Sequence, residues 1–228
     1  MKKYHIFKIN LNTLNIVSLL LMVVMILVTI IISPKLSIAA LEIFSNYKTM
    51  FLFFPCMILY MILHELFHAL GYINHGADAR KITFGMELEK GVFYCLCKQD
   101  INKKTILYAL AYPLFFLGIV TYIVSIIFNL PVLLLLSITN ISGAAGDIMY
   151  LLFISKLDKN IIFSELDDGT SFAIKTKENP DKVKHIGLIY DGTKSEIPRK
   201  DFKTLKVSKG SFIMIVICVI SVILGFIL

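Results

Sequence analysis

The segment TMFLFFPCMILYMILHELFHALGYI (residues 49–73) decides both the fold class and the candidate chemistry. It contains no Lys or Arg, and it is long enough to cross a bilayer core of about 30 Å, which takes roughly 20 apolar residues. It nevertheless holds His64, Glu65 and His68. Ionisable side chains inside hydrocarbon are costly and usually mark functional sites, so we expect a transmembrane helix that carries a site.

The rest of the chain also has the composition of an integral membrane protein. Of its 228 residues 57% are hydrophobic, and the mean hydropathy is +0.78. Four further segments lack Lys and Arg and are long enough to span a membrane: 14–33, 105–128, 131–154 and 211–228. We therefore expect an all-α polytopic membrane protein with about five transmembrane helices.

The predicted spans divide the chain into four parts. The first span has an apolar core of 20 residues, which exceeds the roughly 7–15 residues of a signal peptide, so we expect a retained anchor. The parts are an N-terminal anchor helix with an external loop (1–48), a membrane core (49–154), a cytoplasmic segment (155–210) and a C-terminal transmembrane helix (211–228).

The distribution of basic residues predicts the orientation in the membrane. Segments 1–13, 74–104 and 155–210 carry 3, 6 and 12 Lys or Arg residues, which is 21 of the 23 in the chain. Only Lys35 and Lys48 fall on the other side. This bias predicts a cytoplasmic N-terminus in a multi-pass protein. It also accounts for the net charge of +7, so we expect the lipid bilayer and no nucleic acid as partner.

Short strand-like runs occur in two of the basic segments. In residues 75–104 the runs KITFG and GVFYCLC predict a small membrane-associated β-hairpin, whose edge could pair with an extended peptide. In residues 155–210 the runs TSFAIKTK and HIGLIYDG predict a short cytoplasmic β-containing module with a turn at Asp191-Gly192. Cys95 and Cys97 alternate as on a strand, and we expect them to pack on one face of the hairpin.

The spacing of the three ionisable residues suits a metal ion. Residues i and i+4 share one face of a helix, so His64 and His68 can present two imidazoles to one Zn²⁺. Glu65 lies beside the first histidine, in the H-E-x-x-H arrangement of zinc peptidases. A catalytic zinc usually has three protein ligands and one open position, so a third ligand is needed.

Asp147 is the candidate third ligand. It is the only acidic residue besides Glu65 within a predicted span. The spans that carry His64, His68 and Asp147 run in the same direction, and at about 1.5 Å per residue all three lie ~22–29 Å from the outer boundary. The predicted site is therefore near the cytoplasmic leaflet. The small residues of SGAAG, just before the aspartate, would allow close helix approach.

Two other third ligands stay open. His75 lies one residue beyond the last position of the longer motif HExxHxxGxxH, and this slip moves a helical side chain by about 100°. Asp168 belongs to ELDDG (165–169), for which we favour a turn. Asn140, seven residues before Asp147 on the same helical face, is a candidate for binding a substrate carbonyl; an interhelical hydrogen bond is the equal alternative.

The motifs HELFHALG, GVFYCLCK, AYP and SGAAGDI together resemble a bacterial family of membrane zincin peptidases, HExxH metalloproteases related in layout to the site-2 proteases. The resemblance covers roughly residues 50–175. It implies His64, His68 and Asp147 as Zn²⁺ ligands and Glu65 as the catalytic residue. Site-2 proteases have an Asn/Pro-rich stretch before an Asp-Gly pair, whereas here an isoleucine follows the aspartate.

The resemblance and the motif together predict a function. We expect a zinc-dependent metalloprotease of the bacterial cell membrane that hydrolyses peptide bonds of membrane-associated proteins or peptides. The alternative is a non-catalytic metal-binding membrane scaffold, or a protein that handles a metal or small molecule. The sequence does not identify the substrate or the oligomeric state.

Overall fold

The computed structural model describes residues 3–87, 92–166, 170–176 and 180–195. The chain divides into two compact units, each assembled from separate stretches of sequence. The first unit comprises Met1–Val17, Glu65–Tyr112 and Ala145–Lys206, and the second comprises Ser18–His64, Pro113–Ala144 and Val207–Leu228.

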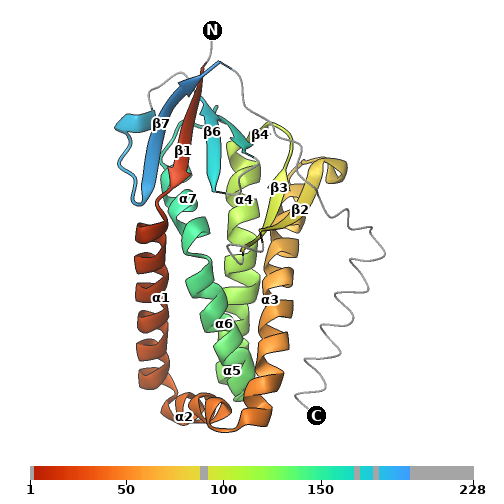
Figure 1. The fold of residues 1–228 in the computed structure, drawn as a ribbon, viewed down its shortest axis with the longest axis vertical. Coiled ribbons are helices and arrows are strands. Elements are labelled where there is room, and N and C mark those ends of the chain that lie inside the picture. The colour runs from red at the N-terminus through yellow and green to blue at the C-terminus, as the bar shows by residue number, and fades with distance from the viewer. Residues whose placement is uncertain (1–2, 88–91, 167–169, 177–179, 196–228) are drawn as a thin grey trace. The chain divides into compact units, whose positions relative to one another are not determined.

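Helices make up most of the described chain (Figure 1). The α-helices are α1 (Leu11–Ile32), α2 (Pro34–Glu42), α3 (Tyr47–Asn74), α4 (Lys103–Pro113), α5 (Thr121–Phe128), α6 (Pro131–Gly143) and α7 (Ala145–Ser155). A π-helical segment, η3 (Leu114–Val120), joins α4 to α5. The 3₁₀ turns are η1 (Ile43–Ser45), η2 (Ala79–Lys81) and η4 (Pro180–Lys182).

Three of the described helices are long and apolar enough to cross a membrane: α1, α3 and the continuous run from α4 to α5. The pair α6 and α7 makes a fourth candidate if it counts as one span. Four of the five predicted spans therefore have helical counterparts, and membrane association is supported. The fifth, 211–228, lies outside the described residues.

The segment predicted as a span over 131–154 is broken into two helices. Helices α6 and α7 meet at a 47° bend, where Ala144 leaves helical geometry with ψ at 12°. Glycines on both sides of Ala144 have a low helix propensity. In the turn before the break, the Ser142 hydroxyl donates to the carbonyl of Thr139, a local bond of the kind that bends helices.

The second unit has a helical core that includes part of the predicted external loop. Pro34 starts helix α2, a first-turn position that suits proline because its missing N–H needs no partner there. Buried side chains of α2 pack with α5 and α6 in a cluster of Leu36, Ala40, Tyr122, Leu134, Ile138 and Ile141. The stretch after the first span is thus a packed helix.

The first unit contains a five-stranded antiparallel sheet with the order β4-β5-β6-β1-β7 (Figure 1). The strands are β1 (Tyr4–Ile9), β4 (Ile101–Asn102), β5 (Ile162–Glu165), β6 (Ser171–Lys175) and β7 (Leu188–Lys194). The sheet extends the predicted cytoplasmic module, because β1 comes from the basic segment 1–13, for which we predicted no strand. The description "all-α" is therefore too narrow.

Strand β7 contains the predicted turn at Asp191-Gly192. The register places Phe7 opposite Tyr190 but His5 opposite Thr193, so β7 has one extra residue. Gly192 has φ of +85°, a conformation that suits a bulge and costs glycine little. The sequence signal for a turn therefore marks a β-bulge, and the turn prediction is wrong.

The predicted hairpin is confirmed as an antiparallel pair, β2 (Ile82–Glu87) and β3 (Val92–Cys97). Cys95, Leu96 and Cys97 are all buried, so both faces of β3 are covered at this point. The two cysteines belong to the core of the first unit, together with aromatic side chains of β1, β5, β6 and α7. Burial raises the pKa of the Cys97 thiol to about 12, which keeps it protonated.

Candidate metal centre

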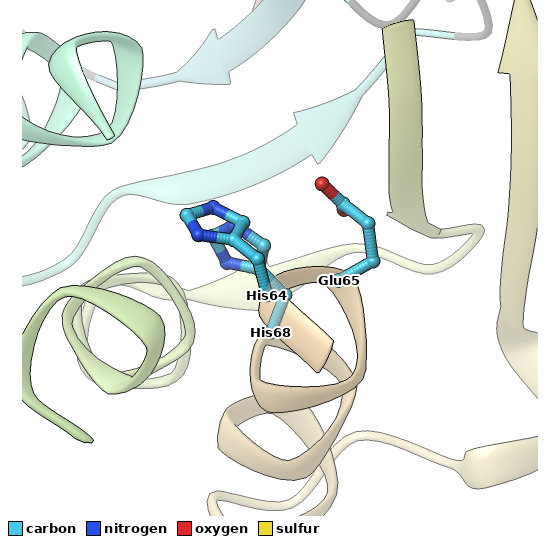
Figure 2. Close-up of side chains that lie close together, drawn as sticks. All are labelled: His64, Glu65 and His68. Atoms are coloured by element: carbon cyan, nitrogen blue, oxygen red, sulfur yellow. The ribbon is translucent and has the colours of Figure 1, made fainter. Parts of the chain in front are cut away.

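His64, Glu65 and His68 lie within one turn of helix α3, and their ligand atoms all lie within 4.8 Å of one another. Among the described residues they form a group that could hold a metal ion. Figure 2 shows the two imidazole rings together and the Glu65 carboxylate extending from the adjacent helix position. The i, i+4 spacing thus places the two histidines on one face, as the sequence predicts.

The His64 ring is held by a side chain of α6. Its Nδ1 lies 2.9 Å from Oδ1 of Asn140. The amide nitrogen of Asn140 donates in turn to the carbonyl of Pro113, at 3.1 Å. Asn140 is buried and joins helices α3 and α4, which matches the predicted interhelical hydrogen bond; both ends of its amide are engaged within the protein.

The His68 ring is held by a backbone carbonyl and faces a carboxylate. Its Nδ1 lies 2.9 Å from the carbonyl oxygen of Ala109, and its Nε2 lies 3.6 Å from Oδ2 of Asp147. His68 is 8% exposed, so both contacts are shielded from water. The structure thus brings the candidate third ligand, Asp147, to one of the two histidines.

The donor set fits zinc. Nε2 of His68 and Oδ2 of Asp147 face each other across 3.6 Å. Two ligands of a tetrahedral zinc with bonds of about 2.0–2.1 Å lie ~3.4 Å apart, close to this value. Imidazole nitrogen and carboxylate oxygen are also ordinary zinc ligands.

Residues 57–162 match the family model described as "Putative zincin peptidase". Over this region the chain is similar to that family. The match includes His64, Glu65, His68 and Asp147, and the family name implies zinc and peptidase chemistry. Comparisons with curated proteins and with solved structures gave no match.

Within the matched region, the close approach of helices α3 and α4 occurs at Gly71. A Cβ atom there would lie 2.6 Å from Cα of Ala109, so only glycine fits without a shift. This approach lies less than one turn from His68 and brings the Ala109 carbonyl within reach of its ring. The predicted close approach at SGAAG is different: a Cβ on Gly143 would meet no atom within 4 Å.

In the described part of the chain, the group whose ligand atoms all lie within 4.8 Å contains neither Asp147 nor the alternative His75. His75 stacks on Tyr108 with ring centroids 3.7 Å apart, and its Nδ1 lies 3.0 Å from the carbonyl oxygen of Gly71. The ring of His75 is thus occupied by an aromatic neighbour at the end of α3. Asp168 lies outside the described residues.

Glu165, the first residue of ELDDG, has a role that the sequence did not indicate. Its carboxylate accepts hydrogen bonds from the Tyr72 hydroxyl, at 2.6 Å, and from the backbone N–H of Cys97. It therefore connects β5 to β3 and to α3, one turn beyond His68. Burial raises the pKa of Glu165 to about 7, against the opposing effect of these two hydrogen bonds.

Proposed function

We propose that this protein is a zinc-dependent, membrane-embedded metalloprotease that cleaves peptide bonds of membrane-associated proteins or peptides. The observation that carries the proposal is the pair of imidazoles one turn apart on α3, with a carboxylate 3.6 Å from one of them. The zincin family match supports the same chemistry.

In this proposal His64, His68 and Asp147 hold the metal, and Glu65 is the general base. Zinc in such a site supplies Lewis acidity to water and to the scissile carbonyl. Glu65 accepts a proton from the attacking water while the oxygen of that water bonds to the carbonyl carbon. It then delivers the proton to the amine nitrogen as the C–N bond breaks. The substrate segment is locally unwound, because a helix shields its carbonyl groups.

The five-stranded sheet supports a specific topology. Hydrogen-bonded strands lie on one side of a membrane, so β1, β4 and β5 share a side and the number of crossings between any two of them is even. Helices α1 and α3 separate β1 from β4. The run from α4 to α7 separates β4 from β5, so the bent pair α6 and α7 counts as one crossing.

We therefore propose four crossings in the described chain, with the sheet and the N-terminus in the cytoplasm. The positive-inside rule selects this side, because the sheet belongs to the Lys- and Arg-rich segments. The site then lies toward the cytoplasmic leaflet, in the half of α3 that leads to the sheet side. The crossing expected at 211–228 stays a prediction.

The test of catalysis is Glu65→Gln, which removes the base and keeps the shape. Zinc content should stay at about one per chain, and turnover should fall by roughly 100-fold or more, the scale of general-base catalysis. Glu42→Gln, the same change at an exposed site on α2, is the matched control.

The readout is comparative membrane proteomics, in which a substrate accumulates uncut in the Glu65→Gln strain. If this strain matches wild type while a His64→Ala strain does not, the metal is needed but hydrolysis is not. The non-catalytic scaffold would then be the better description.

A further inference from the structure

We propose that Asn140 and Pro113 are positioning residues that hold both zinc-binding histidines in one tautomer, with the proton on Nδ1 and the lone pair of Nε2 toward the metal. The inference deepens the proposed function and rests on His64 and His68 as ligands. Two separate sets of contacts carry it, one for each ring.

The orientation of the Asn140 amide follows from its partner. A backbone carbonyl can only accept, so the group that faces the Pro113 oxygen at 3.1 Å must be the NH₂ of Asn140. The oxygen of the amide then faces His64. Because this oxygen also only accepts, Nδ1 of His64 must carry the proton in their 2.9 Å hydrogen bond.

The same reasoning applies to His68 with a different acceptor. The carbonyl oxygen of Ala109 lies 2.9 Å from Nδ1 and can only accept, so Nδ1 carries the proton here too. A helical carbonyl at position 109 would ordinarily accept from the N–H at position 113. Residue 113 is a proline and has no N–H, so it leaves the Ala109 carbonyl available to the imidazole.

Pro113 therefore acts on both rings. Because it has no N–H, the Ala109 carbonyl can accept from His68. Its own carbonyl oxygen accepts from Asn140, which fixes the amide that bonds His64. The π-helical segment that starts at Leu114 follows directly, and π segments often occur at functional sites. Gly118 lies in that segment, where a Cβ would come 2.9 Å from the Ile141 side chain, next to Asn140.

The expected consequence is preorganised zinc binding. A metal-bound histidine usually donates its other ring N–H to a fixed acceptor, and loss of that acceptor typically weakens metal binding 10–100-fold. Asn140→Leu keeps the approximate size and removes the acceptor for His64. Pro113→Ala restores an N–H that competes with His68 for the Ala109 carbonyl.

The experiment uses the full chain in lipid nanodiscs, with ¹⁵N-labelled histidine and no added metal. Nitrogen NMR should show a proton on Nδ1 of both His64 and His68 in the wild type. Asn140→Leu should disturb only the His64 signals, and Pro113→Ala should disturb the His68 signals. Zinc affinity, measured by competition with a chelator, should fall 10–100-fold in each variant.

Matched controls separate positioning from simple loss of packing. Ser137→Ala removes a buried hydroxyl of α6 that bonds only the carbonyl of Leu134, and Pro131→Ala replaces a proline at the first turn of the same helix. Both should leave tautomers and zinc affinity unchanged. Asn140→Asp keeps an acceptor oxygen and should recover much of the affinity lost in Asn140→Leu.

A wild-type spectrum with no proton on Nδ1 of either ring overturns the proposal, whatever the variants do. Wild-type zinc affinity in Asn140→Leu also overturns it. A protein that shows the expected tautomers but binds no zinc would instead contradict the proposed function, so the two failures are distinguishable.

Discussion

The two histidines of α3 have the same chemical task but contrasting surroundings. His64 contacts an uncharged group, the amide of Asn140, whose Oδ1 lies 2.9 Å from Nδ1 of the ring. His68 faces the carboxylate of Asp147. One turn later, Tyr72 bonds a second carboxylate, that of Glu165.

We infer that the neutral amide of Asn140 positions His64, whereas the charge of Asp147 acts on His68. A neutral hydrogen bond orients a ring but contributes little attraction for a cation. A carboxylate next to the second ring supplies both a ligand oxygen and negative charge, and hydrogen bonds and contacts that involve charge are roughly twice as strong as neutral ones. Changes around His68 should therefore affect zinc binding more than changes around His64.

Asp147→Asn should have the largest effect, because it removes the charge and keeps the shape. We expect zinc affinity to fall by more than the 10–100-fold typical of an outer partner such as Asn140. Chelator competition measures this, with Asp158→Asn at an exposed turn as the control. If Asp147→Asn binds zinc like wild type while His75→Ala or Asp168→Ala loses it, the assigned third ligand is wrong.

Gly71→Ala should have an intermediate effect that is confined to the His68 side. The added methyl would lie 2.6 Å from Cα of Ala109, so helices α3 and α4 must separate. Overpacking of this kind costs about 1–3 kcal/mol, and it should lengthen the contact between His68 and the Ala109 carbonyl. Thermal unfolding in detergent and ¹⁵N spectra of His68 are the measurements.

Gly143→Ala is the matched control for this comparison. A Cβ there meets no atom within 4 Å, and replacing a helical glycine with alanine is expected to be neutral or to stabilise by about 0.5–1 kcal/mol. A Gly71→Ala variant as stable as Gly143→Ala would show that α3 and α4 are not closely packed at Gly71.

Glu165→Gln should have the smallest effect on zinc binding, and it should appear mainly as a change in the pH dependence of stability. The pKa of Glu165 is raised from 4.5 to about 7 by burial, so the folded protein binds this proton more tightly than the unfolded chain. The stabilisation is therefore fully present below pH 4.5 and is lost as the pH rises through about 7. One proton accounts for a slope of at most about 1.4 kcal/mol per pH unit.

The measurement is the free energy of unfolding from pH 4 to 8 for wild type and Glu165→Gln. The variant should lack the downward slope between the two pKa values, whereas Glu42→Gln, at an exposed site, should retain it. Parallel pH profiles for wild type and Glu165→Gln would contradict the assigned burial of this carboxylate.

Local patterns in the sequence predicted the features that depend on neighbouring residues. Hydropathy located α1, α3 and the run from α4 to α5, and the i, i+4 spacing brought His64 and His68 together. The approach of Asp147 to His68 agrees with the depth argument, because that argument depends only on helical rise. These predictions need no knowledge of how distant segments pack.

The features that the sequence missed depend on distant partners. Strand β1 lacks a clean polar–apolar alternation, and it pairs with residues more than 160 positions later. The acceptors for the two histidines come from α4 and α6, and one of them is a backbone carbonyl that has no sequence signal of its own. Glu165 is likewise recognisable only from the contacts that its strand makes.

Strand β1 also has a consequence for biosynthesis. It is made long before its two neighbours in the sheet, β6 and β7, which begin at Ser171 and Leu188. While the membrane helices between them are inserted, both edges of β1 have no partners from the mature sheet, and unpaired edges promote aggregation. The nascent chain thus depends on protection of its N-terminal segment until synthesis has passed residue 194, where β7 ends.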